Sequence, residues 1–228
     1  MGDKDRAGAE WRPSGRTGVF VDRRRFLSAL SLAGASFLTG ATGSGAAEPN
    51  PLDIHAILDD PDAPVGGNPD GDVTIVAYVD YNCPFCKRSE PDLQRFVSTD
   101  GQIRLVYKDW PILAKSSVTG ARLALAAKYQ GKYQAAHAAL MALHGRSSDA
   151  VMRSAVATAG VDGAQLEKDL DAHGEAIMDL IRRNAAQADA LHVQGTPVYL
   201  IGPYIAAAAL TYDEFADAVA KFRAHMGK

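Results

Sequence analysis

The segment DVTIVAYVDYNCPFCK, residues 72–87, decides the fold of this chain. Residues 72–79 are rich in β-branched side chains and predict a buried strand. A helical pattern begins at Pro84, where the missing N–H of proline costs nothing, and extends to about residue 97. Residues 103–107 predict a second strand. Strand, helix and strand at this spacing predict a βαβ unit with a parallel pair of strands.

The cysteines of this segment, Cys83 and Cys86, are the only two among 228 residues. A helix start offers unpaired N–H groups and the positive end of the helix dipole, and both favour a thiolate on Cys83. Cys86 lies one turn further on, close enough to attack a mixed disulfide on Cys83 and release the partner protein. The spacing therefore predicts Cys83 as nucleophile and Cys86 as resolving thiol, a redox-active pair that needs no cofactor.

Two other uses of a cysteine pair fit this spacing less well. A structural disulfide that closes a loop of about four residues contributes only about 2 kcal/mol, against about 5 kcal/mol for a loop of about 100 residues. A zinc ion needs four ligands. The histidines that would have to complete the set lack a metal-ligand spacing: His137, His144, His173 and His192. We therefore expect no metal site, and we expect all six histidines, His55 and His225 included, to be surface or capping residues.

The composition fits a folded domain, with 47% hydrophobic, 22% charged and 7% aromatic residues. A disordered chain holds fewer apolar residues, and a disulfide-built mini-protein is shorter and richer in cysteine. The net charge of −3 supplies no basic field for a phosphate backbone, so we expect no nucleic-acid partner.

Residues 1–47 predict an export signal that lies outside the fold. Three arginines, residues 23–25, precede an apolar stretch, residues 26–38, which is shorter than the roughly 20 residues that cross a bilayer. A tract of small residues follows and predicts cleavage after Ala47. Adjacent arginines before a mildly apolar stretch are typical of a twin-arginine signal; the alternative is a chance basic run in a frayed terminus. We expect an exported, periplasmic or otherwise extracytoplasmic protein without a stable membrane anchor.

The remaining chain divides into an N-terminal arm, residues 48–71, and three further segments. The arm is rich in Pro, Asp and Gly, with a short helix expected over residues 52–58. Residues 114–193 show helical composition without a strand pattern, and glycines divide them into four or five helices: Gly131, Gly145, Gly160 and Gly174.

Residues 194–228 predict a short strand, an edge strand and a closing helix. The strand spans residues 198–201, and the edge strand lies near Ile205. In the helix, residues 211–225, Thr211 and Glu214 predict a capping box. The fold class is therefore α/β, with an all-helical stretch inserted between two parts of a sheet.

From about residue 57 to the C-terminus, the sequence resembles the DsbA-like family of exported thiol-disulfide oxidoreductases, within the thioredoxin superfamily. The motifs that carry the resemblance are Asp60-Pro61-Asp62, Gly67-Asn68-Pro69, the segment 72–87, YKDWP at residues 107–111, and Gly195-Thr196-Pro197. The resemblance implies a thioredoxin fold whose halves are residues 72–113 and 194–228, with residues 114–193 as the helical insertion.

The resemblance also implies roles for residues beside the two thiols. In that family the late proline is cis and packs against the active site. Pro197 is then cis, and the backbone of Thr196 meets a substrate strand. Pro84 and Phe85, inside the motif, support the active site.

The sequence departs from the family pattern at two positions. Many relatives carry a buried acid in the strand before the motif, where this chain has Ala77, although Lys108, which looks like the usual partner of that acid, is retained. A buried lysine without a carboxylate loses its charge or finds solvent, so we expect water or Asp80 to take over proton transfer for Cys86, with Lys108 as a further possible member of the proton relay. The strongest oxidants of the family have His where this chain has Phe85, which predicts a less oxidising pair.

These observations favour an enzyme that donates its Cys83–Cys86 disulfide to thiols of secreted proteins and is recycled by a membrane redox partner. Thr196 before the proline favours a reductase or isomerase kept reduced by a membrane donor. The 24 residues of the arm are too few for the dimerisation module usual in isomerases. A third possibility, from another class, is a peptide-binding chaperone with a vestigial dithiol.

Overall fold

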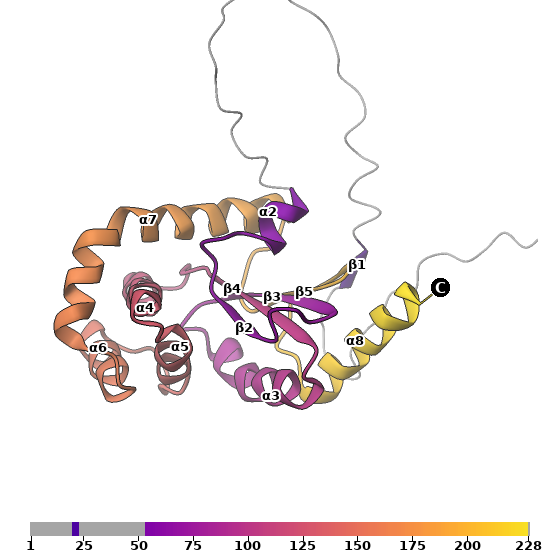
Figure 1. The fold of residues 1–228 in the computed structure, drawn as a ribbon, viewed down its shortest axis with the longest axis horizontal. Coiled ribbons are helices and arrows are strands. Elements are labelled where there is room, and N and C mark those ends of the chain that lie inside the picture. Colours follow the sequence, from indigo (N-terminus) through magenta and orange to yellow (C-terminus); the bar gives the residue numbers. More distant parts are fainter. Residues whose placement is uncertain (1–19, 23–52, 228) are drawn as a thin grey trace, which may run out of the picture.

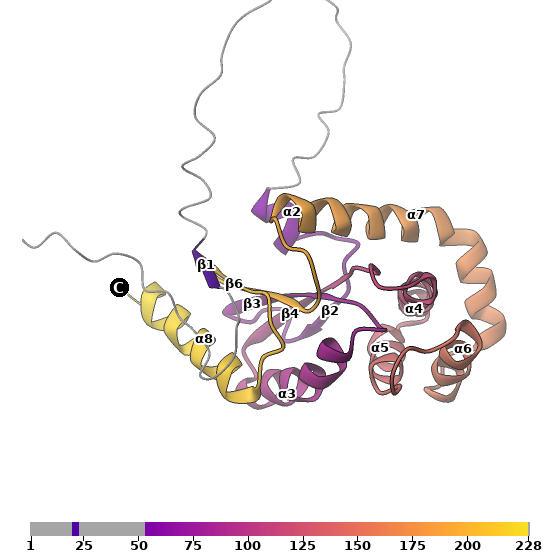
Figure 2. The same ribbon diagram turned by 180° about the vertical axis from the view of Figure 1, so that it is seen from behind.

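The computed structural model describes residues 20–22 and 53–227, and a six-stranded sheet forms its centre (Figure 1). The strand order is β1-β6-β5-β3-β4-β2. Helices α3 (Pro84–Asp100) and α8 (Tyr212–Met226) cover one face of the sheet. The other face packs against α2 (Ile54–Leu58) and the C-terminal part of α7 (Gly163–Ala190). Figure 2 shows the same layers from behind.

The central strands follow the sequence prediction. β3 (Val73–Val79) pairs in parallel with β4 (Ile103–Asp109), and α3 connects the two. On its other side β3 pairs antiparallel with β5 (Val198–Ile201). β3 is buried over almost its whole length because helices cover both faces of the sheet, which explains its run of β-branched residues. The parallel pair, and with it the α/β class, is confirmed.

The helical insertion lies between β4 and β5 and forms a lobe beside the sheet (Figure 1). It contains α4 (Lys115–Ala127), a 3₁₀ turn (Lys128–Gln130), α5 (Tyr133–Met141), α6 (Asp149–Thr158) and α7. Residues 114–193 contain no strand. The prediction that Gly174 separates two helices is wrong, because α7 continues through it for 28 residues. One interior glycine costs about 1 kcal/mol, which the packing of a long helix offsets.

The arm contributes more to the fold than the sequence indicated. Its helix begins at Ile54, and residue 52 lies outside the described residues. A further strand, β2 (Val65–Gly67), pairs antiparallel with β4 and was not predicted. Gly67 has a positive φ of 66°, and a Cβ there would lie 2.3 Å from the carbonyl oxygen of Ile103. Glycine is therefore required for this close approach, although it weakens the strand signal in the sequence.

The opposite edge of the sheet is formed by β1 (Phe20–Asp22), which pairs antiparallel with β6 (Tyr204–Ala206). The sequence placed residues 1–47 outside the fold, and for these three residues that expectation is wrong. The basic and apolar parts of the expected export signal lie outside the described residues. Among the residues that are described, no helix is long and apolar enough to cross a membrane.

The closing helix α8 begins as predicted. The Thr211 backbone N–H donates to the Glu214 carboxylate over 2.8 Å, and both halves of the capping box are present. This cap fixes the start of α8, which packs beside α3 through Phe215 and Phe96.

Candidate active site

Cys83 lies where β3 feeds α3, as the N-cap residue of that helix. Pro84 occupies the first helical turn, and the backbone N–H of Cys86 donates to Cys83 Sγ over 3.4 Å. The Cys83 thiol faces the carbonyl oxygen of Thr196 at 3.1 Å. Both cysteines are free thiols and are almost fully buried. The helix start therefore presents one sulfur to its free N–H groups and holds the second sulfur one turn deeper.

The two thiols differ in acidity. A hydrogen bond from the Cys86 thiol, opposed by burial and aided by the N–H groups of Cys86 and Phe85, lowers the pKa of Cys83 to about 6. Burial raises the pKa of Cys86, and the neighbouring Cys83 raises it further. At neutral pH Cys83 is therefore the thiolate and Cys86 the thiol. This is the division between nucleophile and resolving thiol that the spacing predicts.

The loop before β5 completes the wall around the thiols. The Thr196–Pro197 peptide bond is cis, as the resemblance implied. The carbonyl oxygen of Thr196 faces Cys83, while its hydroxyl is buried and has no hydrogen-bond partner among the described residues. Pro84 and Phe85 are exposed beside the thiols, and the guanidinium carbon of Arg88 lies 4.8 Å from the centre of the Phe85 ring.

The comparisons with known proteins decide the family. Residues 59–221 match the family model described as thioredoxin. The chain belongs to this thioredoxin family. With its C-x-x-C motif at a helix start, the chain is a thiol-disulfide exchange oxidoreductase of the DsbA type, and its fold is the thioredoxin fold with a helical insertion.

Three solved structures illustrate the similarity. A thioredoxin-like oxidoreductase from Silicibacter pomeroyi DSS-3 is 38% identical, with 75% of this chain and 98% of that chain covered and a TM-score of 0.71. A periplasmic thioredoxin-like protein from Salmonella enterica serovar Typhimurium is 29% identical, with 73% and 93% covered and a TM-score of 0.65. The thiol-disulfide exchange protein α-DsbA2 from Wolbachia pipientis is 27% identical, with 73% and 90% covered and a TM-score of 0.70.

Among curated proteins, the chain is similar to part of a much longer membrane protein. It is 28% identical over 173 residues to the Na⁺/H⁺ antiporter NhaA 1 of Mycolicibacterium gilvum, a match that covers 72% of this chain and 28% of the antiporter. The chain spans about a quarter of the length of the curated relatives that it matches.

Lys108 lies on a different face of the sheet from the thiols, which corrects the sequence analysis. It pairs in register with Tyr78, whereas Ala77 pairs with Tyr107 and shares the core that contains Cys86. Alternate residues of a strand point to opposite faces. Lys108 Nζ, fully buried, lies 3.1 Å from a carboxylate oxygen of Asp60. The expectation that Lys108 lacks a carboxylate is therefore wrong, and it is not the partner of an acid at position 77.

The Asp80 side chain holds the active-site loop by binding backbone N–H groups. Its buried carboxylate accepts N–H groups from Asn82 at 2.7 Å, Ile112 at 2.8 Å and Leu113 at 2.9 Å. These bonds fasten the loop after β4 to the loop that carries Cys83. They favour a positioning role for Asp80, and its part in proton transfer stays a prediction.

Asn82 is a site residue that the sequence analysis did not single out. Its side-chain amide donates to the hydroxyls of Ser116 and Ser117 at 3.0 and 3.1 Å, and its oxygen accepts the N–H of Ser147 at 2.9 Å. It therefore ties the residue before Cys83 to two separate parts of the insertion. An asparagine before C-x-x-C carries no general signal, because its partners lie 34 or more residues away in the sequence.

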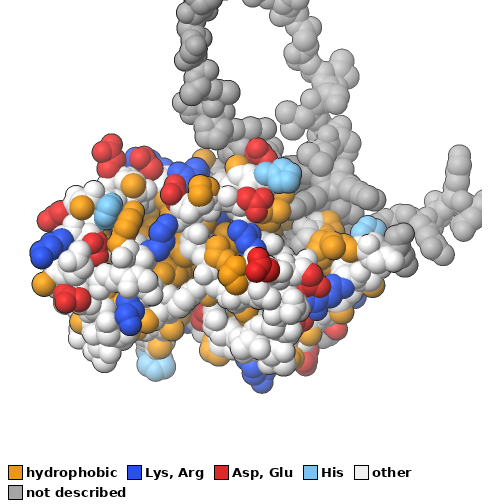
Figure 3. All heavy atoms as spheres, viewed as in Figure 1, with side chains coloured by type: hydrophobic (Ala, Val, Ile, Leu, Met, Phe, Trp, Pro, Cys, Tyr) orange, Lys and Arg blue, Asp and Glu red, His pale blue; other side chains and the backbone are white. Residues whose placement is uncertain are grey.

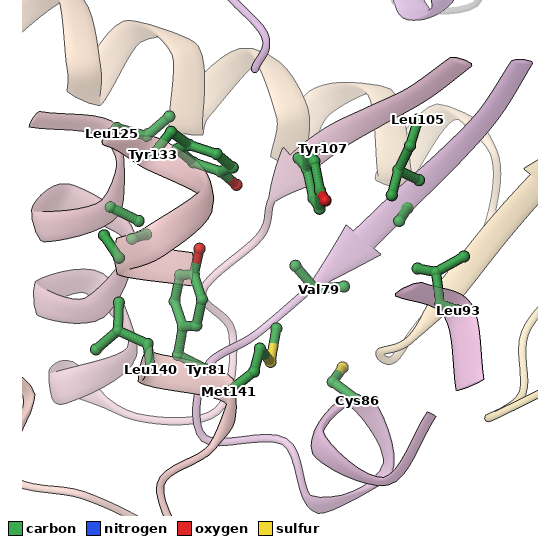
Figure 4. Close-up of a cluster of buried hydrophobic side chains, with 14 of the residues drawn as sticks. Val79, Tyr81, Cys86, Leu93, Leu105, Tyr107, Leu125, Tyr133, Leu140 and Met141 are labelled. Atoms are coloured by element: carbon green, nitrogen blue, oxygen red, sulfur yellow. The ribbon is translucent and has the colours of Figure 1, made fainter. Parts of the chain in front are cut away.

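A buried polar seam lies between α3, the sheet and α5, below the thiols. His137 joins it through both ring nitrogens: Nδ1 lies 2.9 Å from the Tyr81 hydroxyl, and Nε2 lies 3.1 Å from the Glu90 carboxylate. His137 is almost fully buried, so its expected place on the surface is wrong. In Figure 4, Tyr81, Tyr107 and Tyr133 lie between the insertion and the sheet, near Cys86 at the start of α3.

Asp109 is the least satisfied carboxyl of this seam. Tyr133 donates to one oxygen over 3.0 Å, while the other has no hydrogen-bond partner among the described residues. Burial raises the pKa of Asp109 to about 6, against the lowering effects of His137, Tyr81 and Tyr133. The described residues contain no group of three or more His, Cys, Asp or Glu placed to hold a metal ion.

Proposed function

We propose that this protein oxidises dithiols of exported proteins by donating its Cys83–Cys86 disulfide. The observation that carries the proposal is the position of Cys83 at the start of α3, where the backbone N–H of Cys86 donates to Cys83 Sγ over 3.4 Å. This environment lowers the pKa of Cys83 to about 6. A stabilised thiolate favours the reduced form of the pair, and so makes its disulfide a better oxidant than an unperturbed one. The value lies well above the roughly 3.5 of the strongest oxidants, as expected for Phe85 in place of His, and supports moderate oxidising strength.

The low pKa of Cys83 favours the second of the two steps of the exchange. A client thiolate attacks Cys83 Sγ, the Cys83–Cys86 bond breaks, and Cys86 leaves as a thiolate that takes up a proton because its pKa is raised by burial. The second client thiolate then attacks the client sulfur of the mixed disulfide. Cys83 leaves as a stable thiolate, since a low pKa makes a good leaving group. The client loses two electrons and the cysteine pair gains them.

A donor of disulfides must be re-oxidised after each turnover. We propose a membrane redox partner for this step and a location outside the cytoplasm. The periplasmic Salmonella relative supports the location, and the membrane antiporters whose sequences contain a similar stretch support work close to a membrane. The twin-arginine route rests on the sequence of residues 23–38 alone.

Thiol trapping in the native compartment tests the direction of electron flow. Cells are quenched in acid, free thiols are alkylated with a mass tag, and the two forms are separated, with Cys83→Ser as control. We expect the pair to be mostly oxidised. A mostly reduced pair would overturn the proposal in favour of a reductase or isomerase, the alternative that Thr196 before the proline favours. A Cys83→Ala variant that still assists client folding without thiol exchange would favour the chaperone alternative.

A further inference from the structure

A groove beside the C-x-x-C motif is not used by the exchange chemistry described above. It lies between α3 and α5, with a volume of about 550 Å³, within the range of ligand pockets in proteins. Pro84, Lys87 and Pro91 line one wall, and Ala138 and Ala142 contribute to the other. In Figure 1, α3 lies between α8 on one side and α5 on the other.

Large aromatic side chains pack on the side of α3 that faces α8, whereas small side chains lie on the side that faces α5. Towards α8, Phe96 packs against Tyr212 and Phe215, with ring centres 5.7 and 6.1 Å apart. Towards α5, the exposed residues Ala138 and Ala142 stand one turn apart and carry only methyl groups. Small side chains on that helix leave the groove open.

The floor and rim of the groove are held in place without a ligand. The Gln94 amide donates to Glu90 over 2.7 Å and to the Tyr107 hydroxyl over 3.0 Å. Lys87 Nζ donates to the carbonyl oxygen of Gly145 over 2.7 Å and so fixes the loop after α5. A preformed groove whose polar groups are already paired accepts apolar groups at little ordering cost.

The groove is continuous with the catalytic motif, because Pro84 lines it and directly follows Cys83. Thr196 lies against the Cys83 sulfur from the loop before β5, whereas the groove opens towards the insertion. A polypeptide joined to Cys83 through a mixed disulfide thus has neighbouring residues within reach of the groove, since each extended residue spans about 3.3 Å. The rim carries Lys87, and Arg146 directly follows Gly145, which lines the groove. The acidic lining residue Glu90 is buried and paired with Gln94 and His137. The exposed charge at the rim is therefore basic and favours acidic neighbours.

We propose that this groove binds an apolar side chain of the client polypeptide within about three residues of the reacting cysteine, and prefers clients with an acidic residue beside it. The inference rests on the proposed function for the nature of the client. It adds a substrate class: cysteines flanked by an apolar and an acidic residue. Figure 3 shows that charges of both signs and apolar side chains are interspersed on the face in view.

A peptide scan tests the groove directly. Short peptides carry one cysteine, activated as a disulfide, and a leucine moved from three residues before it to three residues after it; serine replaces leucine in the reference peptide. The rate of mixed-disulfide formation is measured on a Cys86→Ser variant, which retains the Cys83 adduct. We expect one side of the cysteine to show a preference for leucine of about tenfold, as partial burial of one leucine predicts.

Filling the groove should abolish this preference. Ala138→Trp and Ala142→Trp place an indole in it from exposed positions, and Ala157→Trp, an exposed alanine on α6, is the matched control. The control should keep the full preference, and all variants should exchange with glutathione as the unsubstituted chain does. A leucine preference that survives both substitutions, or its absence at every position, would overturn the proposal.

The acidic preference has its own measurement. With leucine at its best position, changing a neighbouring Glu to Lys should slow the reaction several-fold at low salt, and the difference should shrink at 0.5 M salt, where screening is strong. Equal rates would remove this part of the proposal.

Failure of the proposed function would look different. If the unsubstituted chain exchanges with neither glutathione nor any peptide, oxidation is refuted. The groove is then tested by calorimetric binding of the same peptides with serine for cysteine, where loss in Ala138→Trp supports it and unchanged binding refutes it.

Discussion

The two faces of the sheet each bury a carboxyl group, and they treat it in opposite ways. On the face covered by α2 and α7, Asp60 accepts Lys108 at 3.1 Å, Arg183 at 2.9 and 3.1 Å, and the N–H of Asp62 at 3.1 Å. On the face covered by α3 and α5, Asp109 accepts one tyrosine hydroxyl and has an oxygen without a partner among the described residues.

The difference shows what each cluster does. Burial would raise the pKa of Asp60, but Arg183 and Lys108 outweigh it and hold the pKa below its usual range. That carboxylate stays charged and clamps the arm to α7. The neighbours of Asp109 are two tyrosine hydroxyls and one histidine, which do not outweigh the effect of burial. Its pKa of about 6 therefore brings its change of charge close to neutral pH. The fold thus separates a permanent structural charge from a titratable one on the thiol side.

Removing the clamp should have the largest effect. Asp60→Ala leaves Lys108 buried without its partner, which costs about 3 to 5 kcal/mol of unfolding free energy. Urea unfolding at pH 7 measures it. The double variant Asp60→Leu with Lys108→Met, which removes both charges, should recover most of the loss. A cost below about 1 kcal/mol for Asp60→Ala would show that water satisfies the lysine.

On the thiol side of the sheet, Asp109 should make the stability of the fold depend on pH. The pKa of Asp109 is higher in the folded state, about 6 against an ordinary 3.8, so folding favours its protonated form. This group therefore lowers stability as pH rises from about 4 through 6, by about 2 to 3 kcal/mol in total. Asp109→Asn should lose that decline, so between pH 4.5 and 7.5 its stability relative to the unsubstituted chain should rise by most of this amount, about 2 kcal/mol, in urea titrations.

Glu90 provides the control for this slope. Burial opposes its ionisation, but His137 and Gln94 outweigh it and hold the pKa of Glu90 below its usual range. Its stabilising effect is complete above its unfolded pKa of about 4.3 and is lost only at lower pH. Glu90→Gln should therefore lower stability by a constant amount between pH 5 and 8. A matching slope in both variants would contradict the assignment to Asp109.

The sequence predicts the parts of this molecule that depend on neighbours along the chain. The β-branched run of β3, Pro84 at the helix start and the capping box at Thr211 act within a few residues, and the structure has all three elements. β2 was missed because its two glycines weaken the strand signal, while the contacts that require them are long-range. Gly67 lies against the carbonyl oxygen of Ile103 in β4, and Gly66 lies against the side chains of Gln134 and Tyr107.

The residues of the site also separate into those fixed by local spacing and those fixed by long-range contacts. The cysteine pair was found because its chemistry needs a fixed local spacing. Lys108 was paired with position 77 because the sequence does not state which face of the sheet a buried charge occupies. The buried position of His137 could not be predicted, because its partner Glu90 lies on another helix, 47 residues away in the sequence. Long-range partners, rather than residue type, decided these roles.

Removing the hydrogen bond from Tyr133 to Asp109 in the thiol-side seam should have the smallest effect on stability. The Tyr133 hydroxyl donates to Asp109 over 3.0 Å, and a hydrogen bond to a charged acceptor is worth more than one to a neutral acceptor. Tyr133→Phe should therefore cost about 2 kcal/mol at pH 8, where Asp109 is ionised, and about 1 kcal/mol at pH 5, where it is mostly protonated. Tyr107→Phe is the matched control, because its hydroxyl accepts from Gln94 and is not bonded to Asp109. That variant should cost the same at both pH values. Equal costs at pH 5 and 8 for Tyr133→Phe would mean that Asp109 keeps one protonation state across this range, and the two faces of the sheet would then differ in geometry alone.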